Sequence, residues 1–345
     1  MRQTRFLSYA AGAALVVALA ACTSSKPAGS AANTAAGNPS AAAASAAVVP
    51  EKAKKNYNLQ FIQGVTGDEF YITMQCGIEA EAAKLGVSVK TQGPQKFDPT
   101  LQKPILDSVV AAKPDAILIA PTDVTAMQTP LQAAAAAGIK VILVDTTTKD
   151  PSYAASAIAS DNIGGGRAAF EAIKNLNPDG GKVMVMSTDP GVSTVDQRIQ
   201  GFAEAAKADP KFQYLPVQYS HNDPATAANL ISSALQRDPD LKGVFAANLF
   251  AAEGTATGVR QAGKTSTVKI VGFDAGPNQI KALQEGTVQA LIAQQPGNIG
   301  QYGVDEAVAA LDGGQVAPKI QTGFTTITKD NLSGEGGQAA YKSSC

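Results

Sequence analysis

The sequence of 345 residues contains no tryptophan, one histidine and three cysteines. With so few cysteine and histidine side chains, a zinc site built from them is close to excluded, and we predict no metal. An excess of one charge is also lacking: 28 basic against 29 acidic residues leave a net charge of −1, so the balance does not favour nucleic acid as a partner. Apolar residues make up 45% of the chain, which is enough for large buried cores and excludes a disordered protein. At about 100–200 residues per domain, the length predicts two domains.

The N-terminus has the pattern of an export signal. Residues 1–5 carry two arginines and no acid, and residues 6–21 contain no charge, a run too short to span a bilayer but typical of a secretory signal. Its end, Leu19-Ala20-Ala21-Cys22, resembles the lipobox of bacterial lipoproteins, in which the cysteine is lipidated and becomes the first mature residue. The alternative is an ordinary signal cleaved after Ala21. Both place the protein outside the cytoplasm, and lipidation of Cys22 would anchor it to the outer face of the cell membrane.

Residues 22–56 are rich in alanine, serine, glycine, asparagine and proline and have almost no bulky side chains. Such a segment cannot bury enough apolar surface to offset the entropy lost on ordering it. We therefore predict a signal peptide over residues 1–21, a disordered tether over residues 22–56 and a folded body that starts near Tyr57.

From residue 59 onward, short apolar runs alternate with amphipathic helical patterns. Strands are predicted at 59–64, 87–91, 116–120, 140–145, 157–160, 182–187, 213–219, 243–248, 268–274 and 288–294. Helices are predicted at 70–85, 100–112, 127–137, 166–176, 197–206, 225–235 and 251–262. Several helices end at a glycine followed at once by a strand, as in Leu85-Gly86-Val87, which is typical of parallel α/β structure. The βα rhythm pauses and starts again, so we predict two doubly wound, Rossmann-like parallel-sheet lobes.

Polar side chains follow many of these strands, at the ends where doubly wound sheets bind ligands. They are Asp68 with the neighbouring Phe70 and Tyr71, Asp145-Thr146, Asn248, Asp274 and Gln294. Planar carboxylates and amides beside aromatic rings suit a polyhydroxylated ligand, whose hydroxyls need paired hydrogen bonds and whose C–H face stacks on a ring. For each aspartate or asparagine, the alternative is that it only caps the following helix.

Seven segments read in order along the chain are GVTGDEFYITMQCGIEAEAAKLGV, IKVILVDTT, IASDNIGGG, QRIQGF, GVFAAN, VGFDAGP and ALIAQQP. Together they resemble the ribose-binding-protein type of periplasmic sugar-binding proteins, the substrate-binding subunits of ABC importers. The resemblance runs from about residue 58 to residue 328. It implies periplasmic binding protein type I architecture, with three segments that cross between the lobes near residues 160–161, 295–296 and 323–324.

The resemblance also implies how the protein works. An N-terminal lobe (57–160 plus 296–323) and a C-terminal lobe (161–295 plus 324–345) close on a monosaccharide or related polyol by hinge motion and deliver it to the membrane subunits of an ABC permease. This function needs no cofactor and no catalysis, and we expect a monomer.

Carried over residue by residue, the resemblance assigns ligand contacts to both lobes. They are Asp68, Phe70, Tyr71 and Asp145 in the first lobe, and Arg198, Asn248, Asp274 and Gln294 in the second lobe and hinge. In this assignment Arg198 donates paired hydrogen bonds, while the aspartates accept bonds from sugar hydroxyls. Thr146 stands where the family often has arginine, Asn222 where an aromatic ring commonly faces the ligand, and Leu249 where an aspartate often follows the asparagine. Thr146 and Asn222 remain candidate contacts, so the sugar class is predicted but not the sugar.

Two short features leave alternatives open. Cys76 and Cys345 are the thiols that remain if Cys22 is lipidated, and in an oxidising compartment we predict a disulfide that pins the C-terminus to the first helix. The alternative is a buried Cys76 and a free Cys345. The run Gly164-Gly165-Gly166 is interpreted as close packing at the hinge, with an anion cradle as the alternative.

Other functions are weighed against this one. A sensory protein that signals to a membrane receptor would use the same bound form, and the sequence does not separate it from an importer component. A transcription regulator of the Lac-repressor type would need an N-terminal helix-turn-helix in place of the export signal. An exported enzyme is disfavoured by the single His221 and the lack of a G-x-S-x-G motif, although a pair such as Asp68 and Asp145 could hydrolyse glycosides. Residues 258–265 match the phosphate-loop pattern but precede a strand rather than follow one, so we predict no nucleotide binding.

Overall fold

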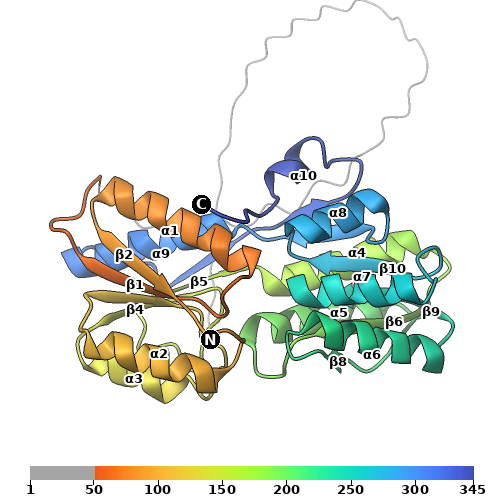
Figure 1. Cartoon of the computed structure of the whole chain (residues 1–345), viewed down its shortest axis with the longest axis horizontal. Helices are drawn as coiled ribbons and strands as arrows, with labels where there is room; N and C mark the ends of the chain where they lie inside the picture. Colours follow the sequence, from red (N-terminus) through yellow and green to blue (C-terminus); the bar gives the residue numbers. More distant parts are fainter. Residues whose placement is uncertain (1–50) are drawn as a thin grey trace, which may run out of the picture. The chain divides into compact units, whose positions relative to one another are not determined.

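The computed structural model describes residues 51–345, which fold into two α/β lobes (Figure 1). The predicted signal peptide (1–21), Cys22 and most of the predicted tether (22–56) lie outside these residues. Contacts with the folded body begin at Ala53 rather than at Tyr57. The Ala53 amide donates to the Leu85 carbonyl at 2.9 Å, and the Lys54 ammonium donates to the Asp312 carbonyl at 2.8 Å.

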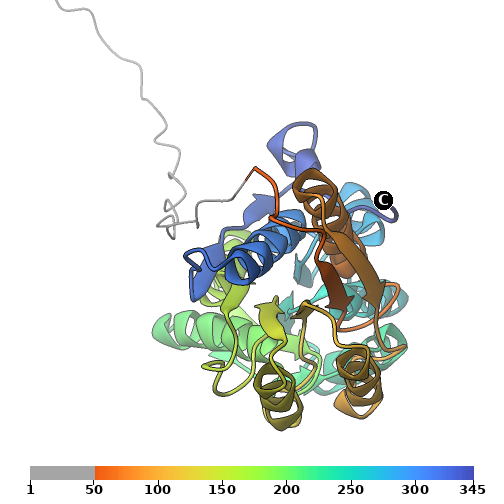
Figure 2. The ribbon, with the colours of Figure 1, turned by 90° about the vertical axis from the view of Figure 1, so that its left-hand side faces the viewer.

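The first lobe is built on a six-stranded parallel sheet in the order β12-β5-β4-β3-β1-β2. Its strands are β1 (Asn58–Ile62), β2 (Ser88–Gln92), β3 (Ala116–Ile119), β4 (Lys140–Val144), β5 (Ser156–Ser160) and β12 (Lys319–Thr322). Its helices are α1 (Glu69–Leu85), α2 (Pro99–Ala111), α3 (Gln128–Ala136) and α9 (Pro296–Asp312). α1 and α9 pack together on one face of the sheet, and α2 and α3 cover the other (Figure 2).

The second lobe has a seven-stranded sheet in the order β13-β11-β10-β9-β6-β7, with β8 also paired to β6. Its strands are β6 (Gly181–Ser187), β7 (Phe212–Tyr214), β8 (Gln218–Tyr219), β9 (Leu241–Ala246), β10 (Lys269–Phe273), β11 (Ala290–Ala293) and β13 (Thr325–Ile327). Its helices are α4 (Asn162–Leu176), α5 (Ser193–Ala208), α6 (Pro224–Arg237), α7 (Leu249–Gln261), α8 (Pro277–Glu285) and α10 (Glu335–Gln338). All pairings are parallel except that of β13 with β11, and the pairs α4–α5 and α6–α7 cover opposite faces.

Burial of both faces explains the uninterrupted apolar strands. In β3 every residue is buried, with Ile117 packed in the core beneath α2 and α3 and Leu118 packed in the core beneath α1 and α9. Successive side chains of a strand point to opposite faces, so only a strand covered by helices on both sides needs an apolar residue at every position. The predicted fold class, two doubly wound parallel-sheet lobes, is confirmed.

The structure corrects several predicted elements. The strand predicted at 213–219 is two short strands, β7 and β8, separated at Pro216, which has no amide hydrogen to donate to a neighbouring strand. The helix predicted at 166–176 begins at Asn162, because the Asp161 carboxylate accepts a hydrogen bond from the Gly164 amide at 2.9 Å and caps it. The strands β12 and β13 and the helices α8, α9 and α10 were not predicted.

The chain passes from one sheet to the other three times. It leaves the first sheet after β5 and enters α4, which packs on β10 and β11. It returns between β11 and α9, and it crosses again between β12 and β13. The C-terminal tail then makes a further link, because a disulfide joins Cys345 to Cys76 on α1, with 5.3 Å between the two Cα atoms. Within residues 51–345, no helix is both long enough and apolar enough to cross a membrane.

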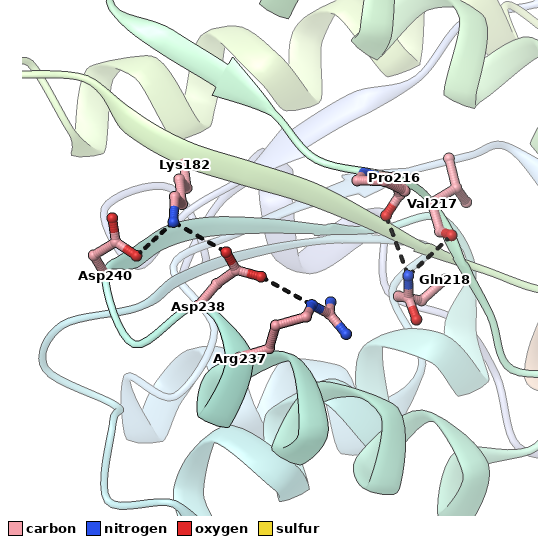
Figure 3. Close-up of polar contacts among 7 residues, drawn as sticks. All are labelled: Lys182, Pro216, Val217, Gln218, Arg237, Asp238 and Asp240. Atoms are coloured by element: carbon pink, nitrogen blue, oxygen red, sulfur yellow. Dashed lines mark hydrogen bonds and ion pairs between the residues drawn. The ribbon is translucent and has the colours of Figure 1, made fainter.

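An ion-pair cluster fixes the second sheet at the edge opposite the carboxyl ends of its parallel strands. At the start of β6, the Lys182 ammonium lies 3.0 Å from an Asp238 carboxylate oxygen and 2.9 Å from one of Asp240, in the turn before β9 (Figure 3). Asp238 also pairs with Arg237 at 3.1 Å. Pairs this accessible contribute at most about 1 kcal/mol each, so the cluster orients a turn more than it stabilises the lobe.

Candidate ligand-binding site

A cavity lies between the two lobes, at the carboxyl ends of both sheets, and it is small, about 40 Å³. It is lined by Asp68, Phe70, Tyr71, Phe97 and Asp145 from the first lobe and by Thr188, Val192, Thr194, Val195, Arg198, Asn222, Asn248, Asp274 and Gln294 from the second lobe and the passage out of β11. The structure therefore brings together all the candidate contacts except Thr146. Doubly wound sheets bind ligands at this edge because the strand ends leave a crevice there.

Thr146 faces away from the cavity. Its side chain is buried, and its hydroxyl donates a hydrogen bond to the Pro121 carbonyl at 2.7 Å. The cause is the backbone of Asp145, whose φ of 64° lies in the left-handed region and turns the chain sharply at the end of β4. The Asp145 side chain enters the cavity and the next one does not.

Arg198 is held rigidly on α5. Its side chain is 3% exposed, its Nε donates to the Asn162 side-chain oxygen at 2.9 Å, and its Nη1 donates to the Ala247 carbonyl at 2.8 Å. The guanidinium carbon stacks 3.8 Å from the centre of the Phe273 ring. Both hydrogen bonds go to neutral acceptors, so the positive charge stays available to a ligand.

The glycine run at the start of α4 helps to position Arg198. A Cβ atom on Gly166 would lie 2.1 Å from the Arg198 carbonyl oxygen, so only glycine lets α4 approach α5 this closely. A Cβ atom on Gly165 would lie 2.7 Å from the Phe273 ring. These contacts support the interpretation of Gly164-Gly165-Gly166 as close packing rather than an anion cradle.

Capping and cavity lining coincide at two of the predicted residues. Asp68 accepts a hydrogen bond from the Phe70 amide at 2.8 Å and caps α1, and Asn248 accepts one from the Ala251 amide at 3.2 Å and caps α7. Both side chains also line the cavity. Capping a helix uses only part of the acceptor capacity of such a side chain. Asp68 and Asn248 can therefore cap a helix and still accept a hydrogen bond from a ligand.

A chain of hydrogen bonds joins the lobes behind the cavity wall. The Ser160 hydroxyl at the end of β5 donates to the Gln294 Oε1 at 2.7 Å, and the Gln294 Nε2 donates to the Asp274 Oδ1 at 2.7 Å. In the first lobe, the Tyr71 hydroxyl donates to the Asp145 Oδ2 at 2.8 Å. These bonds within the protein fix the orientation of both carboxylates.

Aromatic rings cover one side of the cavity. The Phe70 and Tyr71 rings lie 5.1 Å apart and nearly perpendicular, at 80°. Phe97, in the loop between β2 and α2, adds a third ring that the sequence reasoning missed. The signal for it was an aromatic residue directly before the helix cap Asp98, at the carboxyl end of a strand. The four residues from the loop after β6 and the start of α5 (Thr188, Val192, Thr194 and Val195) were also missed, and their small side chains carry no comparable signal.

Burial makes the cavity carboxylates harder to ionise. Desolvation raises the pKa of Asp145 to about 6, although the Arg198 charge and the Tyr71 hydrogen bond oppose the shift. Desolvation also raises the pKa of Asp274, against the Arg198 charge. The pKa of Asp68 rises well above its usual range through desolvation and the nearby Asp274 carboxylate. Three carboxylates thus share a buried space with one guanidinium.

Two other candidate chemistries receive no support from the geometry. In the part of the chain that the structure describes, no three His, Cys, Asp or Glu side chains are grouped to hold a metal ion. The Nδ1 of His221 lies 2.5 Å from the Asp189 Oδ1 at the surface, whereas the Ser220 hydroxyl is buried and donates to the Ser187 carbonyl. His221 and Ser220 therefore do not form a nucleophile and base pair.

Comparison with known proteins identifies the family. Residues 59–315 match the family described as periplasmic binding protein domain. The ribose import binding protein of Escherichia coli (strain K12) is 31% identical over 281 residues, which cover 81% of this chain and 94% of that protein. The D-allose-binding periplasmic protein of the same strain is 30% identical over 257 residues, covering 72% and 83%. This chain belongs to the periplasmic binding protein domain family, and its resemblance to the ribose-binding-protein type is confirmed.

Solved structures agree with this assignment. An ABC transporter solute binding protein from Agrobacterium vitis, bound with α-D-tagatopyranose, is 44% identical with a TM-score of 0.82, and it covers 83% of this chain and 100% of that chain. A second protein from the same organism, with bound D-fucose, is 29% identical with a TM-score of 0.79, again covering 83% and 100%. The family is one of substrate-binding proteins rather than enzymes.

Proposed function

We propose that this protein is the extracytoplasmic substrate-binding component of an ABC importer and that it binds a monosaccharide or a related polyol. The observation that carries the proposal is the cavity between the lobes in which carboxylates from both lobes, one guanidinium and aromatic rings converge. Hydroxyl groups need planar hydrogen-bonding partners, and the C–H face of a sugar packs against rings.

The balance of donors and acceptors supports an uncharged ligand. The Tyr71 hydroxyl gives its one proton to Asp145, and the Gln294 and Asn248 side-chain amides each give one of their two N–H groups to an acceptor of the protein itself. The carboxylates keep unused lone pairs, because each ionised carboxylate accepts about four hydrogen bonds. The cavity therefore offers acceptors on its carboxylates and donors on Arg198 and the side-chain amides, with three acidic side chains against one guanidinium. It matches a polyol that donates from each hydroxyl, and it repels uronates and sugar phosphates.

We propose that the three passages between the sheets act as a hinge. Two backbone amides of the first lobe donate directly to the second lobe: the Val124 amide to the Gly191 carbonyl at 3.0 Å, and the Thr147 amide to the Ser193 hydroxyl oxygen at 2.9 Å. A sugar that contacts both lobes only in the closed state shifts the equilibrium toward that state by its differential affinity. The closed form is then the one that an ABC permease receives.

The location and assembly in this proposal rest on the sequence and the family. Periplasmic binding proteins work outside the cytoplasm, and the N-terminal pattern supports an export signal over residues 1–21. In the proposal Cys22 carries the lipid anchor, residues that follow it tether the body to the membrane, and the protein acts as a monomer without a cofactor.

The test is a thermal-shift screen followed by calorimetry on the chain from residue 23 onward. The panel contains D-ribose, D-allose, D-tagatose, D-fucose and D-arabinose, with D-galacturonate and D-ribose 5-phosphate as matched anionic sugars and with amino acids and nucleosides as other ligand classes. A ligand present at about a thousand times its Kd stabilises a protein by about 4 kcal/mol, which raises the melting temperature by several degrees. We expect at least one neutral sugar to do so and neither anion. Stabilisation by amino acids or nucleosides alone would contradict the sugar class.

A further inference from the structure

The phenol of Tyr341 stands behind the cavity wall, in the C-terminal tail. Its side chain is buried, and its hydroxyl donates to the Asp274 Oδ1 at 3.0 Å and accepts a hydrogen bond from the Gln294 amide at 2.9 Å. The Tyr341 ring lies 6.0 Å from the ring of Phe70 in the first lobe. One side chain outside the cavity thus touches three residues that line it.

The tail around Tyr341 is fastened to both lobes. The Tyr341 amide donates to the carbonyl of Ala275, directly after β10 in the second lobe, at 2.9 Å. The next amide, that of Lys342, donates to the Thr73 hydroxyl on α1 in the first lobe at 2.8 Å. The disulfide then holds the chain end on α1 (Figure 1). The tail crosses from one lobe to the other between Tyr341 and Lys342.

This crossing lies next to the hinge. Residues 338–342 line one groove together with Gln295 and Pro296, where the chain returns to the first lobe, and with Thr325, just after the third passage. A disulfide alone would fix the chain end. It would not require a buried tyrosine whose hydroxyl bonds to Asp274 and Gln294, two residues of the cavity lining.

We propose that residues 339–345 form a fourth connection between the lobes, and that Tyr341 is a positioning residue that holds Asp274 and Gln294 ready for the ligand. The inference rests on the proposed function for its ligand, but the tail contacts stand without it. Removing the hydroxyl leaves the buried Gln294 amide without an acceptor and takes one donor from Asp274. An unpaired buried backbone amide is costly, so we expect the backbone at Gln294 to shift and the Asp274 carboxylate to lose one of the bonds that fix its orientation.

The first test compares Tyr341→Phe with the matched control Tyr214→Phe. The Tyr214 hydroxyl is buried without a hydrogen-bond partner in the described chain, and its ring is outside the cavity lining. Titration of the Asp274 side-chain carboxyl by NMR in the ligand-free protein is the readout. Since the Tyr341 hydrogen bond lowers the pKa of Asp274, we expect a higher pKa in Tyr341→Phe and no change in Tyr214→Phe. An unchanged pKa in Tyr341→Phe overturns the positioning role.

The second readout is affinity for D-tagatose and the other neutral sugars of the panel. We expect binding about tenfold weaker in Tyr341→Phe and wild-type binding in Tyr214→Phe. In Tyr341→Phe, the fall in affinity that protonation of Asp274 causes at low pH should begin at a higher pH. A purely structural role would lower the melting temperature without displacing the pH profile. If the wild type binds no sugar, the proposed function fails, whereas the carboxyl titration still decides the role of Tyr341.

The third test addresses the connection itself. Cys345→Ala removes the disulfide and keeps the buried Cys76 side chain in α1, and Ser344→Ala is the matched control on the same exposed tail. Small-angle scattering of the ligand-free protein should show a larger radius of gyration for Cys345→Ala than for the wild type or Ser344→Ala. Identical scattering of all three proteins overturns the fourth connection.

Discussion

Asp145 and Asp274 occupy equivalent positions in the two lobes and adopt the same unusual backbone conformation. Asp145 follows β4 with a φ of 64°, and Asp274 follows β10 with a φ of 79°. Each amide donates to the neighbouring strand, to the Ile158 carbonyl at 2.8 Å and to the Ile292 carbonyl at 2.9 Å respectively. Aspartate tolerates the left-handed region better than most residues. Each lobe thus ends its strand with the same turn and directs a carboxylate into the shared cavity.

Asp145→Asn and Asp274→Asn test the role of these carboxylates. Asparagine fits the same left-handed backbone, so the turn should survive while the charge is lost. A charge-assisted hydrogen bond contributes about 1.5–3 kcal/mol, so we expect roughly 10- to 100-fold weaker sugar binding from each variant. Calorimetry measures the affinity, and thermal denaturation of the ligand-free variants serves as the control. Full affinity in both variants would remove the two residues from the site.

Sugar binding should weaken as the pH falls through about 6. Burial raises the pKa of Asp145 to about 6, and a sugar hydroxyl that donates to a carboxylate favours its ionised form. Below this pKa, binding must first remove a proton from Asp145, so affinity falls. Calorimetry across this range measures the effect, and Asp145→Asn should flatten this part of the profile. A flat profile in the wild type would contradict the assignment.

The sequence was sufficient for the parts of the fold that are apolar and regular. Strands such as β3 are buried on both faces, so their composition alone reveals them. α9 begins PGNIGQYG, a poor helix former by propensity, and it is held by its packing against α1, which no local pattern records. β12 alternates buried and exposed residues over a short span, and its register comes from β5. The structure of α9 and β12 therefore depends on tertiary contacts rather than on local sequence.

The cavity residues that directly follow strands could be predicted from the sequence, whereas those placed by the path of a loop could not. Strand ends placed Asp145 and Asp274 at one edge of each sheet, because parallel strands bring their carboxyl ends together. Thr146 was predicted as a ligand contact together with Asp145, but the left-handed backbone conformation of Asp145 turns the Thr146 side chain toward Pro121. Phe97 reaches the cavity from a loop whose path depends on the whole lobe. Tyr341 comes from the far end of the chain, and only the tertiary structure shows its contact with Asp274.

Phe97→Ala tests whether this third ring contacts the ligand. Phe97 lines the cavity and also a neighbouring groove, whose lining shares Val192 and Asn222 with the cavity, whereas Phe250 lines that groove alone. An aromatic contact contributes about 0.5–1.5 kcal/mol, so we expect roughly two- to tenfold weaker sugar binding in Phe97→Ala. Phe250→Ala is the matched control and should bind as the wild type does. Equal losses in both variants would show a general effect of the groove rather than a ligand contact.

A buried acid far from the cavity predicts a pH dependence of stability. Asp305 on α9 lies beside Glu81 on α1, and both Asp305 oxygens are buried without a hydrogen-bond partner in the described chain. Two ionised carboxylates cannot hydrogen-bond to each other, but a protonated Asp305 can donate to Glu81. Burial and the Glu81 carboxylate together raise the pKa of Asp305 to about 7 from a usual value of 3.8.

The sign of this dependence follows from proton binding. Between pH 3.8 and about 7 the folded protein holds a proton on Asp305 that the unfolded chain has released, so the free energy of unfolding decreases as the pH rises through this window. Asp305→Asn is neutral at every pH. We expect it to flatten this slope and to raise the free energy of unfolding above pH 7, as measured by urea denaturation. The matched control is Asp107→Asn on the exposed face of α2, which should keep the wild-type slope. A wild-type slope in Asp305→Asn would mean that Asp305 is ionised in the folded protein throughout.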